Sequence, residues 1–173
     1  GMAQKIQFVV TVLHQPKLLI FDEPFSGFDP INANLIKDEI LKLRDDGATV
    51  IFSTHRMESV EELCDHIALI DKSNKILDGK LQDIKKQFKS NTFEVGVNTT
   101  NEKELLNVLK SKFSVAPTTF KSIHDDVKVK IQIDPLSSPN ELLSFLTNQG
   151  QVNHFTEVIP SASDIFIQSV QNN

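Results

Sequence analysis

The sequence is poor in cysteine and has no long apolar run, and both features restrict the class of protein. Cys64 is the only cysteine among the 173 residues, so no disulfide can form within the chain, which fits a reducing cytosol. Apolar runs such as 18–21 and 67–70 are four residues long. A membrane-spanning helix needs about 18 or more apolar residues. We therefore expect a chain that does not cross a membrane.

An excess of positive charge is also absent. The chain carries 18 Lys and Arg against 23 Asp and Glu, a formal net charge of -5. This mixture offers no basic stripe that could follow a phosphate backbone, so we expect no nucleic-acid partner. Tracts rich in Pro, Gly or Ser are missing as well. The whole chain is therefore expected to fold, as one medium domain or two small ones.

The first half of the chain predicts helices alternating with strands. Continuous apolar runs are typical of strands that are buried on both faces of a parallel sheet, and apolar residues at a spacing of three and four indicate helices. The alternation predicts an α/β fold. The expected elements are a helix at 3–14, a strand at 17–21, a helix from Pro30 to Gly47, a strand at 48–52, a short helix at 57–63, a hairpin at 65–77 that closes the sheet, and a small helix at 80–88.

The second half has a different pattern. Apolar and polar residues alternate at 93–97 and 127–133, which indicates half-buried antiparallel strands. With helices at 102–112 and 139–148 and a last strand at 152–158, the order is close to βαββαβ, which favours a small ferredoxin-like α+β domain. We place the domain boundary after residue 90, giving domains 1–90 and 91–173. Ser161 or Ser163 is expected to cap a final helix.

Two acidic residues stand where the first predicted strand ends. Asp22 and Glu23 follow the apolar run 18–21. In phosphoryl transfer, one carboxylate can help to hold Mg²⁺ while a second orients or deprotonates the attacking water. By itself this pattern is equally compatible with an ordinary strand end.

The neighbouring residues make the pattern more specific. Ser26, Gly27, Phe28 and Asp29 follow shortly after, and the next predicted strand leads to Thr54-His55. In these three elements the chain resembles the ATP-binding cassette (ABC) family. Its Walker B strand ends in Asp-Glu, its D-loop reads Ser-x-Leu-Asp with Phe28 here in place of Leu, and its next strand leads to a switch histidine. Asp29 also has a simpler interpretation, as the cap of the helix that begins at Pro30.

The resemblance implies a role for each of these residues. Asp22 would hold Mg²⁺ through water, Glu23 would be the general base, and His55 would contact the γ-phosphate. Ser26 and Asp29 would contribute to nucleotide binding, with ATP and Mg²⁺ as the cofactors. Gly1 resembles the end of the signature motif and would contact the nucleotide of the opposite subunit. The fold that the resemblance implies is the C-terminal part of the parallel sheet of P-loop NTPases.

The phosphate-binding loop of such ATPases is not found in this sequence. No Gly-x-x-x-x-Gly-Lys-Ser/Thr occurs in the 173 residues, so no loop of that kind can cradle the β- and γ-phosphates. We therefore expect the chain alone neither to bind ATP tightly nor to hydrolyse it. The segment Pro160-Ser161-Ala162-Ser163-Asp164-Ile165-Phe166 is similar to the end of a small C-terminal domain on ATPase subunits of certain bacterial ABC exporters.

The function implied is that of an ATP-hydrolysing subunit of an ABC transporter, of the exporter type. Its expected partners are a second ATPase subunit, in a homodimer, and a transmembrane permease subunit. Its expected place is the cytoplasm, peripheral on the inner face of the cell membrane. Two alternatives remain open: a non-catalytic regulatory or interaction module, in which the βαββαβ unit binds a partner or a small ligand, and a soluble ABC-type ATPase that acts outside transport.

Overall fold

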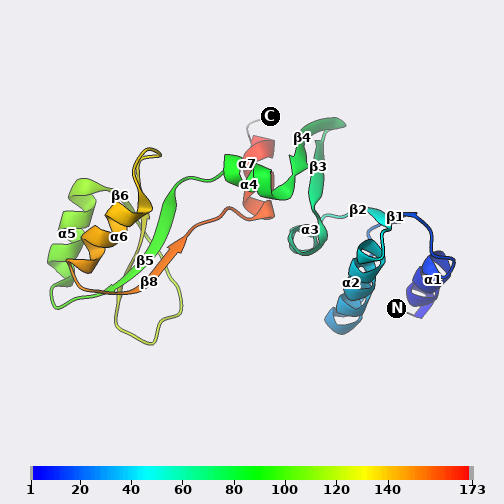
Figure 1. Ribbon diagram of the computed structural model, residues 1–173, viewed down its shortest axis with the longest axis horizontal. Coiled ribbons are helices and arrows are strands. Elements are labelled where there is room, and N and C mark those ends of the chain that lie inside the picture. Colours follow the sequence, from blue (N-terminus) through cyan, green and yellow to red (C-terminus); the bar gives the residue numbers. More distant parts are fainter. Residues whose placement is uncertain (1, 172–173) are drawn as a thin grey trace. The chain divides into compact units, whose positions relative to one another are not determined.

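The computed structural model describes residues 2–171, which fold into two compact units (Figure 1). Unit 1 comprises the chain up to Leu81 together with the residues from Ala162 onward, and unit 2 comprises Gln82–Ser161. The last helix therefore groups with unit 1, whereas the predicted division assigns it to the second domain. Among the described residues, no helix has the length and apolar character that crossing a bilayer requires.

Unit 1 contains the elements that carry the predicted chemistry. They are α1 (Met2–Val12), β1 (Leu18–Asp22), α2 (Pro30–Asp45), β2 (Thr49–Ser53), α3 (Met57–Leu63), β3 (His66–Asp71), β4 (Asn74–Lys80) and α7 (Ala162–Gln171). Helix α4 (Leu81–Gln87) begins at Leu81, the residue at which the N-terminal segment of unit 1 ends. Each predicted element of this half is present, with boundaries shifted by one or two residues in most cases.

The strands β1 and β2 pair in parallel, with Leu19 opposite Val50 and Asp22 opposite Ser53. The crossover between them is α2, as the sequence predicts. Phe25, Ile36, Ile40 and Leu63 form the buried core on this side of the strands, and Phe25 is 0% exposed. Burial of apolar side chains such as these is the main source of stability in a small unit.

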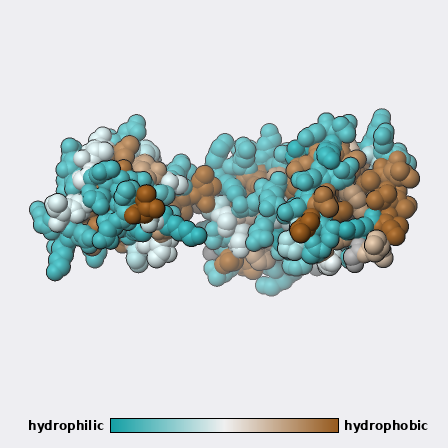
Figure 2. Space-filling model, turned by 90° about the horizontal axis from the view of Figure 1, so that it is seen from below, coloured by the Kyte–Doolittle hydropathy of each residue, from teal (hydrophilic) through white to brown (hydrophobic). Residues whose placement is uncertain are grey.

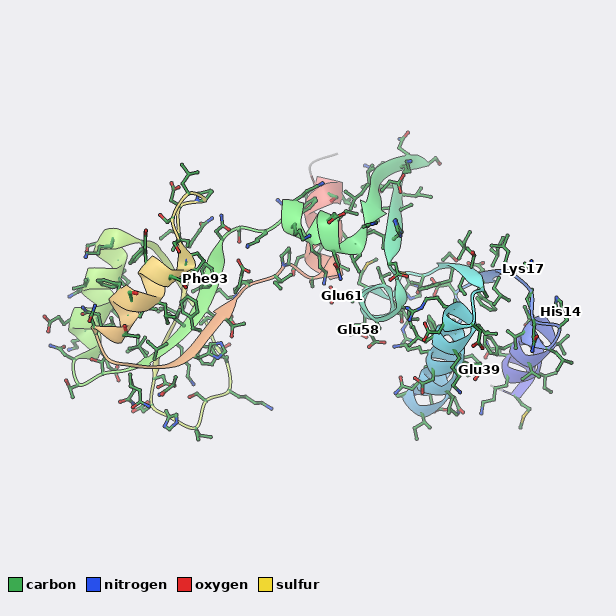
Figure 3. All side chains as sticks on the ribbon, viewed as in Figure 1. His14, Lys17, Glu39, Glu58, Glu61 and Phe93 are labelled. Atoms are coloured by element: carbon green, nitrogen blue, oxygen red, sulfur yellow. The ribbon has the colours of Figure 1, made fainter. Side chains whose placement is uncertain are left out.

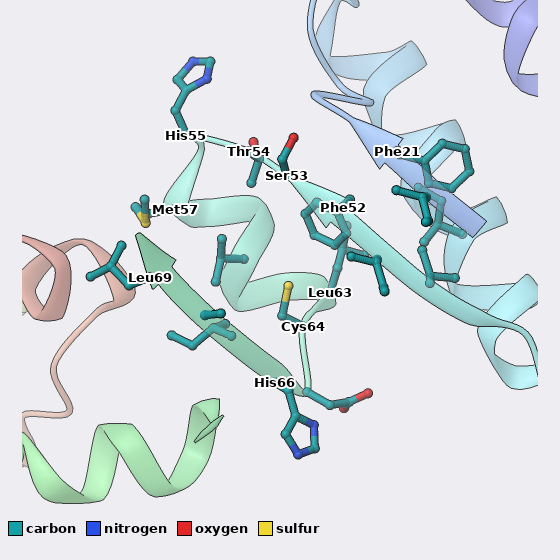
Figure 4. Close-up of a pocket in the computed structure, with 18 of the residues that line it drawn as sticks. Phe21, Phe52, Ser53, Thr54, His55, Met57, Leu63, Cys64, His66 and Leu69 are labelled. Carbon is teal, nitrogen blue, oxygen red and sulfur yellow. The ribbon is translucent and has the colours of Figure 1, made fainter. Parts of the chain in front are cut away.

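The prediction that both faces of β1 and β2 are buried is wrong. Leu18, Ile20 and Ile51 are 53%, 70% and 54% exposed, because α2 covers one face and a groove of about 1430 Å³ borders the other. Phe21, Phe52 and Leu69 are among the residues that line this groove (Figure 4). Apolar runs of this kind are suited to strands that are buried on both faces, but the described residues cover only one face of β1 and β2.

The hairpin does not close the sheet. β3 and β4 pair with each other in antiparallel fashion and form a separate two-stranded sheet. The groove is lined by residues of both β2 and β3, so these strands face each other across it instead of sharing hydrogen bonds. The hairpin itself was predicted correctly.

Helix α1 carries an exposed apolar face. Met2, Ile6, Val9, Val10 and Leu13 are each more than half exposed. Figure 2 shows apolar surface at the right-hand end of the molecule, where α1 lies. The helical spacing that predicted this element therefore marks an apolar face that no described residue covers.

Helix α7 packs on α3, with Ala162 and Ile165 only 4% and 1% exposed. The backbone N–H of Ala162, in the first turn of α7, donates to the carboxylate of Glu61 on α3 (Figure 3). A carboxylate at this position satisfies a free N–H and interacts favourably with the helix dipole. Glu61 thus contributes to the start of α7 from about one hundred positions earlier in the chain, and the cap expected from Ser161 or Ser163 stays a prediction.

Unit 2 has the βαββαβ order that the sequence predicts. The elements are β5 (Thr92–Asn98), α5 (Glu102–Lys112), β6 (Ser114–Pro117), β7 (Val127–Gln132), α6 (Pro139–Thr147) and β8 (Gln151–Glu157). The strands form one antiparallel sheet in the order β6-β7-β5-β8, and the helices α5 and α6 share a single core with the sheet. Leu105, Leu109, Leu142 and Leu146 from the helices pack there with Val95.

Candidate functional site

The predicted site residues lie where β1 and β2 end. Parallel pairing places the carboxyl ends of both strands at the same edge, so Asp22 lies opposite Ser53. The Ser53 hydroxyl donates to the Asp22 carboxylate, and the Glu23 backbone N–H donates to the Ser53 carbonyl oxygen at 3.0 Å. Two segments 31 residues apart in the sequence are thereby joined.

The structure brings Glu23 and His55 into direct contact. Glu23 Oε1 lies 2.7 Å from His55 Nδ1 and accepts the His55 backbone N–H at 2.8 Å. The Thr54 hydroxyl donates to the other carboxylate oxygen, Oε2, at 3.2 Å. Both oxygens of Glu23 are therefore held by the segment that follows β2.

These contacts favour the charged form of Glu23. The bond from the His55 side chain, with the His55 backbone N–H and the Thr54 hydroxyl, lowers the pKa of Glu23 below its usual value, against the opposing effect of desolvation. The Glu23 side chain is 31% exposed and that of His55 is 81% exposed. Glu23 is thus held as a carboxylate within reach of solvent, next to the His55 imidazole.

The backbone at Glu23 is strained. Its φ of 46° lies in the left-handed region, which residues with a Cβ seldom adopt. Such strain costs about 1–3 kcal/mol and is common at functional sites. Here it turns the chain sharply out of β1, so that the Glu23 side chain meets the end of β2.

The segment after Glu23 is a tight turn supported by α1. The Ser26 backbone N–H donates to the Glu23 carbonyl oxygen at 3.0 Å, and Gln4 Nε2 donates to the Ser26 carbonyl oxygen at 3.1 Å. Gly27 has a φ of 75°, and a Cβ there would lie 3.0 Å from Gln4 Nε2. Only glycine adopts this backbone without penalty, so the turn depends on Gly27.

Asp29 is the N-cap of α2. Its Oδ1 accepts the Asn32 backbone N–H at 3.0 Å, and this bond is the first cause of the lowered pKa of Asp29. The capping interpretation is therefore confirmed. The nucleotide contacts of Ser26 and Asp29 stay predictions, and the predicted contact at Gly1 lies outside the described residues.

Some residues of the site were missed by sequence reasoning. Gln4 and Ser53 received no role, and Thr54 was noted only as the neighbour of His55. Arg56 Nη1 also donates to the carbonyl oxygen of buried Phe25 at 3.4 Å, which ties the two loops a second time. Polar residues beside a strand end could have indicated Ser53 and Thr54, but nothing local to Gln4 indicates a contact 22 residues away.

His55 lies at the mouth of the apolar groove. Figure 4 shows Ser53, Thr54 and His55 in succession where β2 ends, with the imidazole directed away from Cys64 and Leu63 inside the groove. Burial raises the pKa of the Cys64 thiol to about 11, so this cysteine is a neutral thiol at physiological pH and not a nucleophile.

The lowered pKa of Glu23 predicts a pH dependence of stability. A carboxyl whose pKa is depressed by folding stabilises the folded state above its unfolded pKa, about 4.3, and loses that contribution as the pH falls through the folded value. We expect wild type to be more stable than Glu23→Gln at pH 7, and this difference to become smaller as the pH falls toward 3. Urea unfolding of both proteins at pH 7, 5, 4 and 3 measures it, and a difference that is unchanged at pH 3 would contradict the assignment.

Several ABC transporter ATP-binding proteins are similar to this chain in sequence. The uncharacterized ABC transporter ATP-binding protein YhaQ of Bacillus subtilis is 39% identical over 171 residues, 98% of this chain and 54% of its own length. The linearmycin resistance ATP-binding protein LnrL of the same organism is 33% identical over 147 residues, 84% of this chain and 46% of its own. The fluoroquinolones export ATP-binding protein Rv2688c of Mycobacterium tuberculosis is 43% identical over 70 residues, 40% of this chain and 23% of its own.

The chain belongs to the ABC transporter ATP-binding protein family. Within it, residues 79–170 match the family described as ATP-binding protein DrrA1-3-like, C-terminal domain. Nearly the whole of this chain aligns with YhaQ, but it spans only about half of YhaQ's length.

Proposed function

We propose that this chain is the C-terminal part of an ATP-hydrolysing subunit and that Glu23 and His55 act together in the hydrolytic step. The observation that carries the proposal is the 2.7 Å contact between Glu23 Oε1 and His55 Nδ1 at the ends of two parallel strands. A carboxylate with a depressed pKa is fully ionised at pH 7, which a proton acceptor requires. The adjacent His55 imidazole would contact the γ-phosphate and help to place the attacking water.

The residues at the strand ends fit Mg²⁺ of a bound nucleotide. Mg²⁺ prefers oxygen ligands and usually keeps several waters, so one or two carboxylates suffice. Asp22 would hold it through water, with its carboxylate oriented by the Ser53 hydroxyl. When bound, Mg²⁺ would neutralise part of the negative charge of the nucleotide phosphates.

The remaining roles in the proposal concern nucleotide and partners. Ser26 and Asp29 would face the nucleotide from the turn that Gln4 supports. The subunit would pair with a second copy and with a transmembrane permease, as a peripheral protein on the inner face of the membrane. The names of two relatives, one for linearmycin resistance and one for fluoroquinolone export, favour an exporter.

The proposal also specifies the fold class further. β1 and β2 would belong to the parallel sheet of a P-loop NTPase, completed by residues outside this chain. Unit 2 would be a ferredoxin-like domain, supported by its βαββαβ order and by the strand order β6-β7-β5-β8. The division into domains 1–90 and 91–173 remains part of this proposal.

Calorimetry with MgATP tests the proposed function. We compare this chain with a version extended upstream, by its natural coding sequence, to the length of the relatives. We expect the extended version to bind MgATP and this chain to show no measurable binding, because the strand-end residues hold a phosphate only when a phosphate-binding loop cradles it.

The other outcomes each have a clear meaning. Binding by this chain alone would contradict its predicted inactivity and would require a second nucleotide site. Binding by neither version would favour the non-catalytic interaction module, in which unit 2 binds a partner.

A further inference from the structure

The orientation of Glu23 depends on a residue to which the family resemblance assigns no role. Thr54 Oγ1 accepts the Arg56 backbone N–H at 3.1 Å and donates to Glu23 Oε2 at 3.2 Å. A hydroxyl has one hydrogen, so acceptance from Arg56 directs that hydrogen to the carboxylate. The β-branched side chain of Thr54 has few rotamers, which further restricts this geometry.

The two oxygens of Glu23 are held by different residues. His55 binds Oε1 through its backbone N–H and its ring, whereas Thr54 binds Oε2. Contacts to Oε1 alone leave the carboxylate free to rotate about the bond to its terminal carbon. A donor at Oε2 fixes the plane of the carboxylate and therefore the direction of its free lone pairs.

We propose that Thr54 is a positioning residue, which orients the Glu23 carboxylate for its reaction with water through a hydroxyl aligned by the Arg56 backbone N–H. The inference rests on the proposed function for its kinetic consequence. The hydrogen bonds themselves belong to this chain and are testable without nucleotide. Thr54 acts on the reaction only through Glu23, to whose Oε2 it donates.

The substitutions that test this role differ in a single group. Thr54→Val keeps the branched shape and removes the hydroxyl, whereas Thr54→Ser keeps the hydroxyl and removes a methyl group. Thr118→Val is the matched control, because it removes the same kind of bond, a threonine hydroxyl that donates to a carboxylate, between Thr118 and Glu94 in unit 2.

Amide hydrogen exchange followed by NMR tests the contacts in this chain. In Thr54→Val we expect faster exchange of the Arg56 amide, which loses its acceptor, and of the His55 amide, whose acceptor Glu23 is less restrained. A rise of about fivefold corresponds to the loss of one ordinary hydrogen bond. Thr54→Ser and Thr118→Val should both exchange at the wild-type rate at these two amides. Unchanged exchange in Thr54→Val, with unit 2 exchanging as in wild type, would overturn the proposed contact.

Steady-state ATP hydrolysis by the extended version tests the positioning role. We expect Thr54→Val to lower kcat about fivefold with KM for ATP unchanged, and Thr54→Ser to restore it. Faster exchange together with a wild-type kcat would overturn the role and leave Thr54 as a structural contact. If the wild-type extended version does not hydrolyse ATP, the proposed function fails and the positioning role fails with it, whereas the exchange data still decide the hydrogen bonds.

Discussion

Replacing Glu23 with Gln is expected to lower the rate of ATP hydrolysis by the extended version about 10²- to 10⁴-fold, the usual contribution of a general base. The amide has nearly the shape of the carboxylate but cannot accept a proton from water. Binding of MgATP should persist, because the contacts of the phosphates lie elsewhere. Phosphate release under saturating MgATP measures the rate, and calorimetry measures the binding.

Glu39→Gln provides the matched control for this experiment. Glu39 lies on α2, where its carboxylate pairs with Lys42 at 3.2 Å, and it is not part of the strand-end site (Figure 3). The same chemical change there should leave hydrolysis within about twofold of wild type, since surface ion pairs contribute little. Hydrolysis by Glu23→Gln at the wild-type rate would show that Glu23 is not the base.

Replacing Phe25 with Ala is expected to destabilise unit 1 by about 3–5 kcal/mol, the cost of deleting a fully buried aromatic side chain. Phe25 is 0% exposed, and its ring contacts Phe52 edge to face at a centroid distance of 5.8 Å. It also lies in the turn between Glu23 and Ser26. Loss of the ring should therefore loosen the site as well as the core.

Hydrogen exchange with mass spectrometry measures this loss separately for each unit. Peptides from α2 should exchange as if unit 1 were less stable, while peptides from α5 in unit 2 should match wild type and serve as an internal control. Phe25→Leu retains most of the apolar volume and should cost less than Phe25→Ala. Equal exchange of α2 in wild type and Phe25→Ala would show that the ring does not support this unit.

The location of the site was predictable because its signals are local. An apolar run that ends in Asp22-Glu23, a second that ends in Ser53-Thr54-His55, and a helix between them predict parallel strands whose carboxyl ends adjoin. Asp29 before Pro30 likewise predicts a helix cap from neighbouring residues alone, and the structure shows that cap. Because helices and strands have regular geometry, the spacing of residues in the sequence indicates where their side chains lie.

Other features were not predictable because they depend on contacts between distant residues. Gln4 supports the turn at Ser26, and Glu61 binds the first turn of α7, yet neither residue belongs to a recognisable local motif. The exposed faces of β1 and β2 also escaped prediction. An apolar run indicates that a strand is suited to burial on two faces, but only the packing of other elements decides whether both are covered.

The sequence by itself determined the order of the elements, the family and the residues of the Glu23–His55 pair, because hydrophobic period, helix caps and strand ends are encoded within a few residues of one another. The tertiary structure alone decided which oxygen of Glu23 each donor holds, that α7 returns to pack on α3, and that β3 and β4 form a sheet of their own. Hydrogen-bond direction and strand pairing depend on distances of a few ångströms between segments far apart in the chain, and folding sets those distances.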